Sequence, residues 1–147
     1  MQNTGFQGGA TSKIITVRAF TASTGLPYTT LAFNTAGLTA KYTRHGATPQ
    51  TITLVTATAG TWTSSGFIAR NATGGEYELH VPNAALAAGA DYVTFCLYGV
   101  TDCVITEAIV DILGFDPRST STTQVDLRYI NGTAVNGDGS TGNPWGP

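Results

Sequence analysis

The chain has 147 residues, a formal net charge of -2 and 11% charged residues, against about 25% in a typical soluble domain. This length is enough for one domain with a substantial core. The sequence has no apolar run long enough to span a membrane, no secretory signal at its start and no basic stripe for nucleic acid.

The composition is typical of an all-β protein, because Thr and Gly are abundant and good helix formers other than Ala are scarce. Residues 1–12 are polar and Gly-rich and predict an extended N-terminal arm. The β-branched run 14–20 predicts the first strand, and the TASTGLP segment that follows it predicts a turn. Alternation or β-branched residues predict further strands over 38–44, 51–58, 67–69, 76–81, 92–98 and 103–112.

The strand predicted over 76–81 alternates most regularly, and Pro82 ends it. We expect its core-facing side chains to be Tyr77, Leu79 and Val81, and its solvent-facing ones to be Glu76, Glu78 and His80. Residues 83–89 read as one short helical turn, capped by Asn83 and stopped by Gly89.

About seven short strands at this spacing indicate a β-sandwich. Leu86 lies six residues before Tyr92, which opens the next predicted strand after an Ala/Gly corner. This spacing is similar to the tyrosine corner of immunoglobulin-like sandwiches, although Tyr92 could instead be an ordinary core aromatic. We therefore expect a sandwich domain over residues 13–117.

Residues 118–147 differ in character and are expected to form a C-terminal hairpin and a Gly-rich tail. An RSTSTT linker precedes the alternating segment 125–130, and Asn131-Gly132 is a strong hairpin signal. A lone hairpin is unstable in water, so it needs a surface to pack on. Aromatic side chains in Gly-rich arms also need somewhere to bury, so the candidate partner-binding residues are Phe6, Tyr129 and Trp145.

The sequence contains no pattern for catalysis, and we expect no catalytic residues, no metal and no cofactor. Both histidines read as solvated: His45 in a turn and His80 on an outward strand face. The segment 136–140 spaces oxygens like a calcium loop, but it begins with Asn and has no closing Glu. The acceptor patterns at Asn71 and Asn131 are expected by chance in a Thr-rich chain.

The two cysteines can be placed by a register argument. If the hairpin turns about Gly99-Val100, Cys96 and Cys103 lie directly opposite each other on neighbouring strands. They would then be either a disulfide or two buried thiols, and the lack of a secretion signal favours the thiols.

The stretch from Val17 to Asp116 resembles the immunoglobulin-like N-terminal domain of upper baseplate and tail-associated proteins of tailed bacteriophages. The resemblance lies in the segments 17–20, 24–27, 38–42 with Arg44 and Gly46, and above all 75–92. It implies a non-enzymatic module that docks one virion component onto another. Members of this family often continue into long fibres, whereas this sequence ends after a short hairpin and tail.

We therefore expect a structural protein of the phage virion, assembled in the host cytoplasm, without nucleic-acid or membrane partners. A capsid decoration (cement) protein bound to the major capsid protein is slightly favoured over a tail or baseplate adaptor. We also expect a homo-oligomer, with a trimer as one candidate. The alternative from another class is a carbohydrate- or cell-surface-binding module, which depends on whether Trp62 is exposed.

Overall fold

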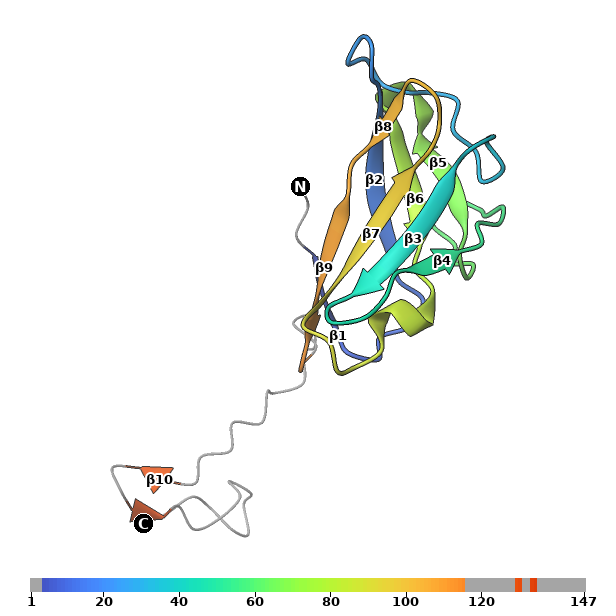
Figure 1. Ribbon diagram of the computed structural model, residues 1–147. Helices are drawn as coiled ribbons and strands as arrows, with labels where there is room; N and C mark the ends of the chain where they lie inside the picture. The colour runs from blue at the N-terminus through green and yellow to red at the C-terminus, as the bar shows by residue number, and fades with distance from the viewer. Residues whose placement is uncertain (1–3, 116–128, 131–132, 135–147) are drawn as a thin grey trace.

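The computed structural model describes residues 4–115, 129–130 and 133–134, and it contains two stacked β-sheets (Figure 1). One sheet has five strands in the order β1-β9-β7-β3-β4, and the other has four in the order β5-β6-β2-β8. The prediction of an all-β sandwich is therefore confirmed. The strand bounds are β1 Thr4–Gln7, β2 Ile14–Thr21, β3 Thr39–Arg44, β4 Gln50–Ile52, β5 Phe67–Asn71, β6 Glu76–His80, β7 Tyr92–Tyr98, β8 Cys103–Ile105 and β9 Ala108–Leu113.

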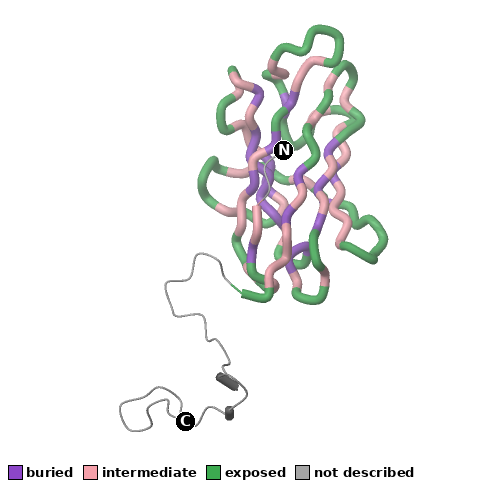
Figure 2. Tube along the Cα trace, turned by 90° about the vertical axis from the view of Figure 1, so that its left-hand side faces the viewer, coloured by how far each residue is buried: buried purple, intermediate pink, exposed green. Residues whose placement is uncertain are grey.

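The predicted alternation places the core between the sheets. Tyr77, Leu79 and Val81 are fully buried, as expected; Val17 contributes from β2 in the same sheet, and Phe95 from β7 in the facing sheet. Buried positions alternate with more exposed ones along the strands (Figure 2). One predicted strand is much shorter than expected: β4 covers only 50–52, because the chain then leaves the sheet as a long loop over residues 53–66.

The predicted N-terminal arm is partly a strand of the sandwich. Thr4–Gln7 forms β1, which pairs in parallel with β9 and aligns Phe6 with Ile112. The side chain of Phe6 is 7% exposed and belongs to the hydrophobic core, with the ammonium of Lys13 5.5 Å from the centre of its ring. Phe6 therefore packs inside its own chain, and the prediction that it anchors a partner is corrected.

The strand predicted over 103–112 is divided between the two sheets. β8 pairs with β2, whereas β9 pairs with β7, and the change of sheet falls at Thr106-Glu107. Thr106 continues the pairing with β2, because its N–H donates to the Arg18 carbonyl oxygen at 2.8 Å. The predicted hairpin about Gly99-Val100 with one continuous return strand is therefore wrong.

The tyrosine corner expected at Tyr92 is not formed there. Tyr92 is 38% exposed and faces out of the sheet, where its ring stacks on His45. A buried tyrosine hydroxyl is found instead at Tyr77, which donates to the Tyr28 carbonyl at 2.7 Å and accepts from the Leu31 N–H at 3.3 Å. The Tyr77 ring also stacks on Phe67 at 5.5 Å between ring centres.

Two short 3₁₀ helices connect strands. η1 (Ala72–Gly74) begins after Asn71, whose side chain accepts from the Gly74 N–H at 3.2 Å. η2 (Asn83–Leu86) closes one end of the sandwich and begins after Pro82 without a side-chain cap, so Asn83 is not its cap. The Asn83 side-chain oxygen Oδ1 accepts instead from the Ser12 N–H at 3.0 Å, which ties η2 to the segment between β1 and β2.

Part of the predicted C-terminal hairpin is described. β10 (Tyr129–Ile130) and β11 (Thr133–Ala134) pair antiparallel, with Tyr129 opposite Ala134. This register is the one expected for a turn at the Asn131-Gly132 dipeptide.

Candidate functional site

Glu78 and His80 lie on the outward side of β6, yet they are 7% and 0% exposed. The expectation that they are solvated is therefore wrong. His80 Nδ1 accepts from the Thr63 N–H at 3.0 Å, and His80 Nε2 lies 3.3 Å from Glu78 Oε2. Because a backbone N–H can only donate, Nδ1 carries no proton, and the Nε2 proton is directed at the carboxylate.

The burial of this pair comes from the 53–66 loop, which folds over the outward side of β6. Glu78 Oε2 also accepts from the Gly60 N–H at 2.8 Å, and the Trp62 indole N–H donates to the Val81 carbonyl at 3.1 Å. Three hydrogen bonds from the loop thus end on Glu78, His80 and Val81. His80 Nδ1 holds the loop directly, and His80 Nε2 contacts the Glu78 carboxylate that binds the Gly60 amide, so both ring nitrogens are used in a structural role.

Trp62 is half-buried, and its polar atom bonds within the chain. Its indole therefore holds the loop to the end of β6. The carbohydrate-binding alternative depended on this residue being exposed. Sequence alternation could not indicate this burial, because it reports which side of a strand a residue occupies and not what covers that side.

His45 follows β3, toward the end of the sandwich that η2 closes, and is half exposed. Its Nδ1 lies 3.1 Å from Asp91 Oδ2, and its ring stacks on Tyr92 with ring centres 4.8 Å apart. A His–Asp pair is one element of acid–base catalysis, but a nucleophile or a bound substrate must reach the other nitrogen. Among the described residues, no hydrogen bond joins His45 Nε2 to such a group.

The cysteines lie in different sheets, because β7 carries Cys96 and β8 carries Cys103. They are half-buried free thiols, which confirms the preferred reading, whereas their predicted face-to-face register is wrong. The Cys96 thiol donates to Glu107 Oε1 at 3.3 Å. Burial and this carboxylate raise the pKa of Cys96, and burial and Asp102 raise the pKa of Cys103. Neither thiol is therefore set up as a nucleophile.

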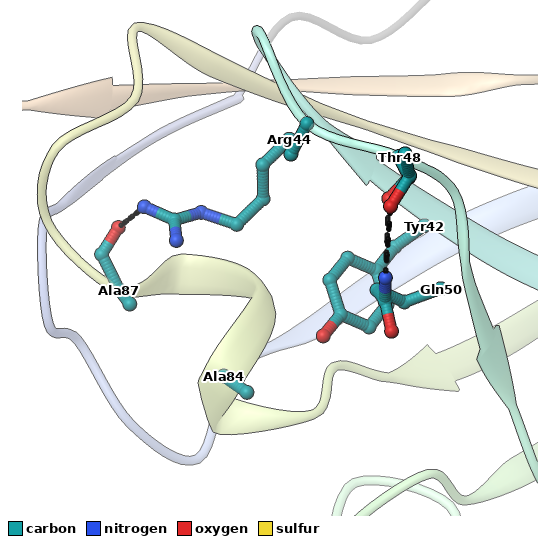
Figure 3. A pocket seen from close by; sticks show the side chains of 7 residues that line it. Tyr42, Arg44, Thr48, Gln50, Ala84 and Ala87 are labelled. Carbon is teal, nitrogen blue, oxygen red and sulfur yellow. Dashed lines mark hydrogen bonds between the residues drawn. The ribbon is translucent and has the colours of Figure 1, made fainter.

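A depression of about 410 Å³ opens between β3, β4 and η2 (Figure 3). Arg44 lies at its wall and donates to the carbonyl oxygens of Ala87 and Ala88, both at 2.7 Å, so its guanidinium holds the chain after η2. Gln50 on the opposite wall donates to Thr48. The Arg44 Nη2 and Gln50 Nε2 groups therefore bond within the chain, whereas the buried Arg44 Nε has no hydrogen-bond partner among the described residues, and the residues that line the depression offer no acid–base pair.

A row of half-buried and exposed apolar side chains crosses the outer face of the four-stranded sheet at one end. Phe20 lies opposite Val104 of β8 on one side and opposite Pro27 on the other. Cross-strand partners project from the same face, and since Ala19 is fully buried, Phe20 points outward. Val104 is 54% exposed, and Leu26, which precedes Pro27, is 64% exposed. We call Phe20, Pro27 and Val104 the apolar row.

Sequence reasoning missed the apolar row, since it placed the docking residues in the terminal segments. The available signal was Phe20 itself, an apolar residue on the outward phase of a strand whose inward phase is Ile15, Val17 and Ala19. Trp145 and the side chain of Tyr129 lie outside the residues whose side chains are described, as does the calcium-like segment 136–140, so their predicted roles stay predictions.

Within the described part of the chain, no three His, Cys, Asp or Glu side chains gather where they could hold a metal ion. The two short helices of that part are far from the length and hydropathy needed to cross a bilayer. In comparisons with known proteins, no family model, no curated protein and no solved structure matches the chain.

Proposed function

We propose that this chain is a non-enzymatic structural protein of a tailed-bacteriophage virion, which docks onto other virion proteins. Capsid decoration is favoured over a role as tail or baseplate adaptor. The observation that carries the docking part is the apolar row, because an exposed apolar strip on a rigid sheet gains free energy when a partner covers it.

The strand order supports the immunoglobulin-like part of the proposal. β3, β7 and β9 are neighbours in one sheet, and β2, β6 and β5 are neighbours in the other. In chain order these correspond to the C-F-G and B-E-D groups of an immunoglobulin-type sandwich. The phage assignment itself rests on the resemblance in the segments 17–20, 24–27, 38–42 and 75–92.

The chemistry of the histidines supports a non-enzymatic role. His80 uses Nδ1 to hold the 53–66 loop and Nε2 to contact Glu78, and His45 pairs with Asp91 on an open surface. Residues 118–147 remain the second proposed contact, through Tyr129 and Trp145.

A charge placed in the apolar row tests the docking surface. We expect Val104→Lys to weaken binding to particles assembled without the protein by at least about tenfold, because a lysine cannot be buried against an apolar partner without losing its hydration. Val55→Lys is the matched control, since Val55 is also exposed, at 37%, but lies on the 53–66 loop. Binding is measured by co-sedimentation with the particles.

Equal binding by Val104→Lys and Val55→Lys would contradict the docking role of the apolar row. Removal of residues 118–147 is the second arm of the same assay. A truncated chain that stays folded and binds with full affinity would contradict the proposed roles of Tyr129 and Trp145.

A further inference from the structure

The central strand of the five-stranded sheet, β7, carries no charge on its outer side. Its outward side chains are Tyr92, Thr94, Cys96 and Tyr98. Tyr98 is 48% exposed and Tyr92 is 38% exposed. On the neighbouring strand β3, Lys41 projects from the same face between two threonines.

The outer face of the four-stranded sheet is different. Its strands present Arg18, paired with Glu76, together with Arg70 and the Glu78–His80 pair, and its own 53–66 loop covers a part of it. Interface cores are depleted of charged residues and enriched in tyrosine relative to other protein surface. The uncharged outer side of β7 has this composition, and the charged side chains Lys41, Glu107 and Asp111 lie beside it on β3 and β9, the two neighbours of β7 in the sheet (Figure 1).

The charged side chains of that face lie on the two sides of β7. Lys41 lies opposite Cys96, and Cys96 bonds to Glu107, so the three form a row across β3, β7 and the start of β9. At the start of β7, four residues before Cys96, Tyr92 stacks on His45 and lies opposite Asp111 of β9. Lys41 and His45 thus flank β7 on the β3 side, where Asp91 pairs with His45, and the carboxylates of Glu107 and Asp111 flank it on the β9 side.

This arrangement selects one way for the face to meet a second copy of itself. Rotation by a half-turn about an axis that lies in the interface along β7 brings the β3 side of one copy over the β9 side of the other. Lys41 then faces Glu107 of the second copy, and His45, which also pairs with Asp91, faces Asp111 of the second copy. A half-turn about an axis across the strands places β3 over β3, and like charges meet.

We propose that the chain forms a two-fold symmetric dimer through the outer face of β3, β7 and β9, with Lys41 paired to Glu107 of the second copy. At roughly 4.8 Å between strands and 3.3 Å per residue, the three strands form a face of roughly 14 Å by 20 Å. This face is smaller than that of a stable complex, so the dimer is weak and dissociates on dilution. The inference does not rest on the proposed virion function.

Charge reversal tests the pairing by sedimentation equilibrium of the full chain over a range of concentrations. Lys41→Glu and Glu107→Lys each place like charges at both symmetry-related contacts, and each is expected to raise the dimer dissociation constant at least about tenfold. The double variant restores opposite charges and returns the constant to within a few-fold of the wild-type value. Arg70→Glu, on the other outer face, leaves it unchanged.

Circular dichroism melts of each variant show whether it is folded before its association is compared. A wild-type chain that stays monomeric at every concentration would overturn the proposal, as would a trimer with no dimer. So would a dimer that responds equally to Lys41→Glu and Arg70→Glu. Loss of particle binding in the Val104 variant affects none of these outcomes, so the two proposals fail separately.

Discussion

The hydroxyl of Tyr77 ties the segment after β2 to the centre of the sandwich. It bonds to the Tyr28 carbonyl and the Leu31 N–H within the core. Tyr77→Phe keeps the ring and its stacking on Phe67, but it leaves these two backbone groups without their partner. We expect a loss of about 1–3 kcal/mol in the free energy of unfolding, measured by urea denaturation.

Tyr98→Phe is the control for this experiment, since the Tyr98 side chain is 48% exposed and its hydroxyl can be solvated in either state. Its removal is expected to change the stability by less than about 0.5 kcal/mol. Equal losses in the Tyr77 and Tyr98 variants would contradict the structural role of the buried hydroxyl.

The pH dependence of Cys96 follows from its surroundings. Burial and the Glu107 carboxylate raise the pKa of its thiol. In a Cys103→Ser background, we expect the rate of alkylation by iodoacetamide to rise with pH only above the ordinary thiol range. Glu107→Gln removes the negative charge, so the midpoint of this profile moves to lower pH.

The raised pKa of Cys96 also fixes the sign of its contribution to the free energy of unfolding. A thiol whose pKa is higher in the folded than in the unfolded chain contributes stability below the unfolded pKa, and this contribution is lost as pH rises through the folded pKa.

The control for the alkylation experiment is Glu76→Gln, which alters a carboxylate in the other sheet and should leave the alkylation midpoint of Cys96 in place. An alkylation midpoint that does not move in Glu107→Gln would show that the carboxylate does not act on the thiol.

At the scale of single residues, alternation predicted the inward set of β6 correctly but not the burial of Glu78 and His80. The side of the strand was right, and the burial follows from Gly60 and Thr63, which are near in space and about 17 residues away in sequence. Local periodicity has no access to such contacts, because they depend on where a loop returns.

At the scale of elements, the 53–66 loop depends on acceptors supplied by β6. His80→Leu removes the acceptor of the Thr63 N–H, so we expect hydrogen exchange at the Thr63 amide to accelerate about tenfold or more. His80→Asn keeps a side-chain oxygen that can accept from Thr63, and it should preserve most of the protection. Exchange is followed residue by residue by NMR.

The Gly60 amide serves as the internal reference for the loop, because it donates to Glu78 rather than to His80. If the Thr63 and Gly60 amides accelerate together in His80→Asn as much as in His80→Leu, the effect is general loosening of the loop. That result would contradict a specific role for His80 Nδ1.

Two elements escaped prediction for a shared physical reason. β1 is a four-residue segment, TGFQ, with little β character of its own, and its strand form comes from pairing with β9. The division of 103–112 into β8 and β9 likewise reflects which neighbour each half meets. The long self-contained alternations of β2, β3, β6 and β7 were predictable, because their periodicity is local.

At the scale of the whole molecule, the two proposed contacts lie on the two opposite outer faces of the sandwich. The four-stranded sheet offers the apolar row at one end and is otherwise charged or covered by its own loop. The five-stranded sheet offers a face whose central strand β7 is uncharged on its outer side, with Lys41 on one neighbouring strand and Asp111 on the other. Composition predicted the low overall charge, but only the strand order shows how the few charges are placed, and the two proposed contacts lie on separate surfaces.

The number of copies per particle distinguishes the favoured role from its alternative. A decoration protein occupies equivalent sites over the whole shell, so we expect hundreds of copies in a simple ratio to the major capsid protein, measured by quantitative mass spectrometry of purified particles. A tail or baseplate adaptor would instead be present in a handful of copies that match the symmetry of the tail. The Val104→Lys variant, supplied in place of the wild-type chain, should lower the copy number in either case, because both roles use the apolar row. Particles that contain no copies would contradict the virion proposal, while the fold and the dimer contact would stand on their own measurements.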